Sequence, residues 1–184
     1  MAVSAPDPRR WFALAVVGAA FFMTVLDVSI VNVALPTIGK KLDFKPENLQ
    51  WVITAYSLTF GGFLLLGGRA ADLLGRRRVF IAGTILFTAA SLVCGLSGSE
   101  GLLIAARAVQ GVGGAIISAS ALSIVSTTFT EGAERNKALG IWGALGGSGA
   151  AVGVLLGGVL TKYLGWEWIF FSTAPRWASS SAAC

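Results

Sequence analysis

The chain has 184 residues, of which 55% are hydrophobic and 12% are charged, and its formal net charge is +5. Because soluble domains carry about 25% charged residues, this composition, with a mean hydropathy of +0.76, indicates a membrane protein and excludes an ordinary soluble domain. The net charge does not indicate nucleic-acid binding, since the basic residues lie in short segments between apolar runs and form no basic face with interleaved aromatic residues.

Residue types that carry metal and acid–base chemistry are scarce in this sequence. Histidine, the commonest metal ligand and general base, is absent. The two cysteines are Cys94, inside an apolar run, and Cys184, the last residue, and they have neither metal-ligand spacing nor an evident disulfide pairing. We therefore expect no enzyme, no metal site and no cofactor.

The first span follows a short polar leader, residues 1–10, which ends in two arginines. An apolar run then continues over residues 11–35, which is too long for the core of a signal peptide. We expect an uncleaved helix that starts on the cytoplasmic side, with Trp11 at the membrane interface.

Four further apolar runs approach or exceed the roughly 20 residues needed to cross a bilayer. They cover residues 51–68, 79–96, 102–128 and 138–160. With the amino terminus inside, the cytoplasmic basic residues are Arg9, Arg10, Arg69, Arg76, Arg77, Arg78, Arg135 and Lys137, and the external ones are Lys40, Lys41, Lys45 and Lys162. The excess of basic residues on the inner side supports this orientation.

An acidic residue, Asp27, lies inside the first span. A carboxylate near the middle of a span costs about 2.5–3.5 kcal/mol on insertion scales, so Asp27 should face a bundle interior or a watery cavity. It could form a proton or cation site, or it could only hydrogen-bond to a neighbouring helix.

The segment between the second and third spans, Gly67–Arg78, concentrates charge. It contains Arg69, Asp72, Arg76, Arg77 and Arg78 between two apolar runs. We expect a tight loop at a membrane face, in which the paired glycines let two helix ends approach and Gly75 allows the turn. From composition alone, a merely basic loop beside the membrane is an equally good interpretation.

The fourth span carries a small and polar face. Arg107, Gln110, Gly111, Gly114 and Ser118 recur at helical spacing. This face should pack inward and direct Arg107 at other helices or a cavity. The alternative is that Arg107, which lies near the start of the span, extends to the outer interface.

The fifth span carries a stripe of glycines, Gly146, Gly149, Gly153 and Gly157, followed by Gly158. Small residues spaced by three and four let helices approach closely, a role that by itself needs no transport.

An internal repeat relates two parts of the chain ninety positions apart. Residues 64–68 (Leu-Leu-Leu-Gly-Gly) match residues 154–158 (Val-Leu-Leu-Gly-Gly), and Leu74-Gly75 matches Leu164-Gly165. The basic residues 76–78 correspond to Trp-Glu-Trp at residues 166–168. This pattern predicts an inverted three-plus-three repeat, with one loop cytoplasmic and the other external.

The sixth span begins at residues 166–171, but the apolar stretch is far shorter than a crossing requires. Residues 172–184 form an aberrant Ser/Ala-rich tail. We expect a truncated or frame-shifted reading frame, or a partial gene model. The predicted fold class is thus an all-α polytopic membrane protein, an incomplete six-helix bundle over residues 11–171.

Four segments resemble motifs of one family. The pattern Gly-x-x-x-Asp-x-x-Gly-Arg-Arg-Arg from Gly68 resembles the signature loop between spans two and three of the major facilitator superfamily, although Leu73 stands where a basic residue is usual. Residues 26–36 resemble the span-one motif of its fourteen-span drug:proton antiporters, and residues 102–115 resemble the superfamily's span-four motif. Residues 149–158 resemble the antiporter motif, with Val154 where proline is frequent.

The resemblance implies the amino-terminal part of a proton-coupled exporter of drugs or other small amphipathic molecules, in a bacterial plasma membrane. It implies a proton-coupling cavity at Asp27, Arg107 and Gln110, a cytoplasmic gate at Gly68, Asp72, Gly75, Arg76, Arg77 and Arg78, and helix packing by Gly149, Gly153, Gly157 and Gly158. The implied partners are the lipid bilayer, a small-molecule substrate, protons and a second transporter half. The alternative is a non-transporting membrane fragment or a subunit that assembles with another half.

Overall fold

The computed structural model describes residues 9–129, 132–163 and 165–173. All regular structure in this part of the chain is helical, which confirms the predicted all-α class. The helices are α1 (Arg9–Lys41), α2 (Pro46–Leu49), α3 (Trp51–Leu74), α4 (Arg76–Gly95), α5 (Glu100–Thr128), α6 (Ala133–Tyr163) and α7 (Glu167–Thr173). Five of them, counting α2 and α3 as one segment, are long and apolar enough to cross a membrane.

The structure corrects the predicted loop over Gly67–Arg78. Residues 67–74 continue α3, and α4 begins directly at Arg76. Gly75 alone separates α3 from α4. Its φ angle is +93°, a backbone conformation that is strained for any residue with a side chain. The first helix also begins earlier than expected, at Arg9 rather than Trp11. Most of the predicted leader and tail, residues 1–8 and 174–184, lies outside the described residues.

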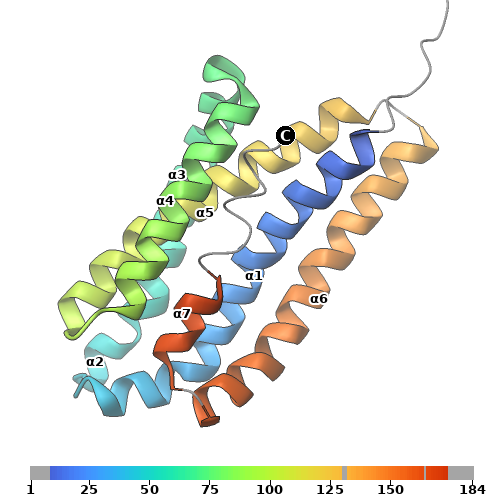
Figure 1. Cartoon of the computed structure of the whole chain (residues 1–184). Helices are drawn as coiled ribbons and strands as arrows, with labels where there is room; N and C mark the ends of the chain where they lie inside the picture. The colour runs from blue at the N-terminus through green and yellow to red at the C-terminus, as the bar shows by residue number, and fades with distance from the viewer. Residues whose placement is uncertain (1–8, 130–131, 164, 174–184) are drawn as a thin grey trace, which may run out of the picture.

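The helices run alternately up and down the bundle (Figure 1). α3 and α4 pack along α5, whereas α6 packs along α1, and α7 contacts α4 and α1. The packing of α3 on α5 therefore corresponds to the packing of α6 on α1, as an inverted repeat of three helices requires.

Two pairs of glycines ninety positions apart occupy matching environments. Gly75 and Gly165 both have positive φ angles, +93° and +98°. A Cβ atom on Gly67 would lie 3.2 Å from Cα of Ile116, and one on Gly157 would lie 3.2 Å from Cα of Ile30. The turn after α3 and the turn after α6 lie at opposite ends of the bundle (Figure 1). These matches agree with the inverted repeat predicted from the sequence.

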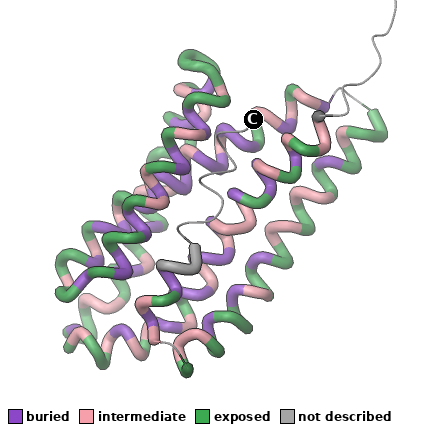
Figure 2. The backbone as a smooth tube through the Cα atoms, in the orientation of Figure 1, coloured by how far each residue is buried: buried purple, intermediate pink, exposed green. Residues whose placement is uncertain are grey.

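The interior contains two apolar clusters, one toward each end of α1. The first cluster includes Leu14, Val17, Phe80, Phe87 and Phe129. The second includes Ile30, Ile38, Leu103, Trp166 and Phe170. Buried positions recur along α1, α4 and α5, while α6 is buried at few positions along its length (Figure 2).

The glycine stripe of α6 lies against α1. Gly149, Gly153 and Gly157 are buried, and Cβ atoms added to them would lie 2.5–3.2 Å from atoms of α1. The prediction that Gly158 also packs against a helix is wrong, because Gly158 is exposed and a Cβ atom there would meet nothing within 4 Å. Of the four glycines predicted to pack helices, three therefore do so.

Substitution of Gly153 should test how α6 is held. In Gly153→Leu the new side chain would overlap Ser29, because a Cβ atom on Gly153 would lie 2.5 Å from Cβ of that residue, so α6 must move away from α1. We expect a loss of about 1–3 kcal/mol in the free energy of unfolding, measured by SDS titration of the reconstituted protein. Gly158→Leu is the matched control on the open face and should change it little. Equal losses for the two variants would show that α6 is not held by this face.

Candidate functional site

A buried ion pair joins α1 to α5. Nη1 of Arg107 donates to Oδ2 of Asp27 over 2.6 Å. The two side chains are 1% and 0% exposed. Arg107 thus lies inside the bundle, and the alternative in which it extends to the interface does not hold. The pair lies between the two apolar clusters, since it is flanked by Val52 of one and Tyr56 of the other.

Gln110 completes a closed triangle with this pair. Its Nε2 donates to Oδ1 of Asp27 over 3.0 Å, and its Oε1 accepts from Nη1 of Arg107 over 2.7 Å. Both carboxylate oxygens of Asp27 therefore accept a hydrogen bond from α5. Gln110 lies one turn after Arg107, and this helical spacing points both side chains at α1.

The surrounding helices supply further polar contacts. Nε of Arg107 donates to the backbone oxygen of Val52 over 3.2 Å. Nε2 of Gln110 donates to Oγ of Ser91 over 3.2 Å, and Sγ of Cys94 lies 3.6 Å from Oε1 of Gln110. Oγ of Ser91 donates in turn to the backbone oxygen of Phe170 over 3.2 Å. The network thus connects α1, α3, α4, α5 and α7.

Tyr56 covers the guanidinium group from α3. Cζ of Arg107 lies 4.3 Å from the centre of the Tyr56 ring, within the range of a cation–π contact. Tyr56 is 4% exposed. Close approach of α3 and α5 here depends on Gly111, because a Cβ atom on it would overlap the backbone oxygen of Tyr56.

The arrangement has a definite electrostatic consequence. The carboxylate and the guanidinium cancel each other's charge, so the interior is neutral while Asp27 is ionised. Two charges removed from water are costly to bury unless they are paired and hydrogen-bonded, as these are. Of the two, only the carboxylate can gain a proton under ordinary conditions, since arginine stays protonated. Protonation of Asp27 would leave a net positive charge at Arg107.

The predicted cytoplasmic gate residues lie at the end of the bundle where α1 begins and do not touch the network. Asp72 and Arg76 form an exposed ion pair of 3.5 Å across the turn at Gly75. Arg77 and Arg78 are exposed, and a Cβ atom added to Gly68 would meet nothing within 4 Å. A single exposed pair contributes little stability, at most about 1 kcal/mol.

The glycine stripe of α6 contacts the backbone of α1 next to Asp27. A Cβ atom on Gly153 would lie 3.0 Å from the backbone oxygen of Leu26, the residue before Asp27. The position of α6 and the position of the Asp27 backbone are therefore linked through van der Waals contact.

Sequence reasoning missed three residues of the site, Tyr56, Ser91 and Cys94. Ser91 and Cys94 lie three positions apart inside the apolar run of α4, so both fall on one helix face. That spacing was a usable signal, because polar groups within a span are expected to face the bundle interior. Tyr56 carried no comparable signal, since an aromatic ring in a span is ordinary.

Comparison with protein families and curated proteins gives a consistent picture. The Major Facilitator Superfamily model matches residues 17–175. The puromycin resistance protein pur8 of Streptomyces alboniger is 51% identical over 95% of this chain and 35% of its own length. The cephamycin export protein CmcT of Amycolatopsis lactamdurans is 45% identical, over 89% of this chain and 34% of its own.

A solved structure shows the same fold. A bacterial homologue of the human lysosomal transporter Spinster, in an inward-facing and unoccupied conformation, matches 97% of this chain and 43% of its own, with a TM-score of 0.80 and 18% identity. The chain spans about a third of the length of the curated relatives that it matches.

Proposed function

Because the chain belongs to the Major Facilitator Superfamily, whose members here are transporters rather than enzymes, we propose that it is part of a secondary transporter that exports small amphipathic molecules in exchange for protons. The observation that carries this proposal is the buried triangle of Asp27, Arg107 and Gln110. The names of the relatives, which include resistance to puromycin and export of cephamycin, support a substrate among small bioactive molecules. The chain is a multi-pass bacterial membrane protein, and we propose that its amino terminus is cytoplasmic.

In the proposed mechanism Asp27 is the group that takes up and releases the proton. While Asp27 is ionised, its charge is balanced by Arg107 and both of its oxygens are held by α5. A proton on Asp27 neutralises the carboxylate and leaves the charge of Arg107 without a counterion. Separation of α1 from α5 then becomes favourable, because it lets water or substrate reach Arg107. Moving one charge through the membrane potential supplies about 2.3 kcal/mol per 100 mV, which is enough to drive accumulation.

The turn around Gly75 is the proposed gate. Asp72, Arg77 and Arg78 are exposed at one end of this bundle, where a second bundle of the transporter could pair with them. Formation and loss of such pairs would stabilise one facing state over the other. Gly75, whose φ angle is positive, would keep the end of α3 close to the start of α4.

The direct test is transport of puromycin into inverted membrane vesicles prepared from cells that express the protein at the full length that its gene encodes. An imposed pH gradient should drive puromycin uptake into these vesicles. In an Asp27→Asn variant the gradient-driven uptake rate should be at least about tenfold lower than in the wild type. Asn32→Ala, on the exposed face of α1, serves as the control. Gradient-driven transport at an unchanged rate in Asp27→Asn would remove Asp27 from proton coupling.

A second candidate is a membrane subunit that acts only when assembled with another half. The helices described here form one bundle, whereas superfamily transporters bind substrate between two bundles. Affinity purification from native membranes should then recover a second polytopic chain in a constant ratio. Purification of this chain by itself, with gradient-driven transport, would contradict the candidate.

A further inference from the structure

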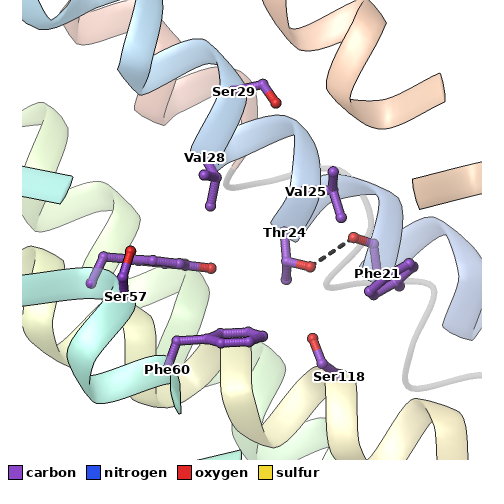
Figure 3. A pocket seen from close by; sticks show the side chains of 9 residues that line it. Phe21, Thr24, Val25, Val28, Ser29, Ser57, Phe60 and Ser118 are labelled. Atoms are coloured by element: carbon purple, nitrogen blue, oxygen red, sulfur yellow. Dashed lines mark hydrogen bonds between the residues drawn. The ribbon is translucent and has the colours of Figure 1, made fainter. Parts of the chain in front are cut away.

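A cavity of about 320 Å³ lies next to the charged triangle. Three helices, α1, α3 and α5, surround it (Figure 3). Its lining consists of Phe21, Thr24, Val25, Val28, Ser29, Tyr56, Ser57, Phe60 and Ser118. The volume is at the lower end of the range for ligand pockets, about 300–1,000 Å³, and fits one ring system rather than a whole large molecule.

The lining is uncharged and combines aromatic rings with hydroxyl groups. Oγ1 of Thr24 already donates to the backbone oxygen of Phe21 over 2.7 Å. Oγ of Ser118 is different: it is buried and has no hydrogen-bond partner among the described residues, and Ser118 is only 9% exposed. Figure 3 shows its hydroxyl group directed from α5 into the space near Phe60 and Thr24. A buried hydroxyl group without a partner is costly, so the cavity favours a ligand that satisfies it.

Tyr56 belongs both to this cavity and to the charged triangle. Its ring lies 4.3 Å from Cζ of Arg107, and it stacks on Phe60 with 5.9 Å between ring centres and an interplanar angle of 16°. Phe60 and Tyr56 together form an aromatic wall of the cavity. A ligand that presses on this wall therefore acts on the ring that covers the guanidinium group.

We propose that the cavity binds an uncharged aromatic group carrying one hydrogen-bonding substituent, and that Tyr56 is a positioning residue that links its occupancy to the Asp27–Arg107 pair. The aromatic group stacks on Phe60 and Tyr56, and its substituent bonds to Oγ of Ser118. This inference rests on the proposed function for its biological meaning, since it identifies the part of a substrate that exchanges with the proton.

Three small probes test the subsite in the full-length protein held in lipid nanodiscs. β-Naphthol has both the ring system and the hydroxyl group, β-methylnaphthalene lacks the hydroxyl group, and decahydro-β-naphthol lacks aromaticity. After correction for partitioning into empty nanodiscs, β-naphthol should bind about three- to tenfold more tightly than either analogue. Ser118→Ala should abolish only the preference over β-methylnaphthalene, and Phe60→Leu should reduce only the preference over decahydro-β-naphthol. Equal binding of the three probes, or preferences unchanged in the variants, would overturn the subsite.

The link through Tyr56 is tested by a double-mutant cycle with the same probe. Asp27→Asn should change the dissociation constant of β-naphthol at least about threefold in the wild-type background and in Tyr56→Phe, which keeps the ring. It should have no effect in Tyr56→Leu, or in Tyr56→Met should the leucine variant fail to fold. An equal effect of Asp27→Asn in the ringless background would overturn the link. These binding results do not depend on transport, so a protein that binds β-naphthol as expected but shows no gradient-driven efflux would refute only the proposed function.

Discussion

Arg107→Leu is expected to lower the free energy of unfolding by about 3–5 kcal/mol, the usual loss when one partner of a buried ion pair is removed. The reason is that Asp27, 0% exposed, would lose its counterion and the hydrogen bond from Nη1 of Arg107, and would keep the hydrogen bond from Gln110. SDS titration of the reconstituted protein measures the loss.

The matched control is the double variant Asp27→Leu/Arg107→Leu, in which no unpaired charge remains. It should recover most of the stability lost in Arg107→Leu, because an apolar pair of similar size can replace a buried ion pair at small cost. It should not recover proton-driven transport. A double variant as unstable as Arg107→Leu would mean that shape, rather than charge balance, dominates at this position.

Gly113→Leu is expected to cause the second large loss, about 3 kcal/mol, at the upper end of the usual range for overpacking. A Cβ atom on Gly113 would lie 2.7 Å from the backbone nitrogen and 2.9 Å from Cα of Phe87. Both atoms belong to the backbone of α4, so the clash cannot be relieved by rotation of a side chain. Instead α4 and α5 must separate, which would also pull Ser91 away from Gln110.

Gly101→Leu provides the control on the same helix, since a Cβ atom on Gly101 meets nothing within 4 Å. It should leave the free energy of unfolding within about 0.5 kcal/mol of the wild-type value, as surface substitutions usually do. A similar loss in both variants would indicate an effect of leucine on α5 itself rather than on its packing against α4.

Much of the fold follows from the sequence because lipid imposes a simple rule. Each long apolar run must become a helix that satisfies its own backbone hydrogen bonds, so composition and length suffice to identify the runs. The extent of α3 was harder to predict: Arg69 and Asp72 suggested a loop, yet both continue the helix. Charged side chains at the end of a span can point into the aqueous phase while the backbone stays helical, so charge marks the membrane boundary and not the helix end.

The site was predictable in part for the same reason. Asp27, Arg107 and Gln110 stand out because polar residues within a span are costly unless they face the interior. One sequence could not show that Asp27 and Arg107 pair directly, because their pairing depends on how α1 and α5 cross. The role of Tyr56 likewise depends on Gly111, which brings α3 close to α5, and on a cavity that only the packed bundle creates.

Proton release on substrate binding is the measurement that tests the central claim most directly. The full-length protein, purified in detergent at low buffering capacity with a pH-indicating dye, is mixed with a saturating concentration of a substrate identified in the efflux assay. If the triangle of Asp27, Arg107 and Gln110 exchanges a proton for substrate, the wild-type protein should release about one proton per molecule, and Asp27→Asn should bind substrate and release none. Equal proton release by the two proteins would contradict the assignment of the proton to Asp27.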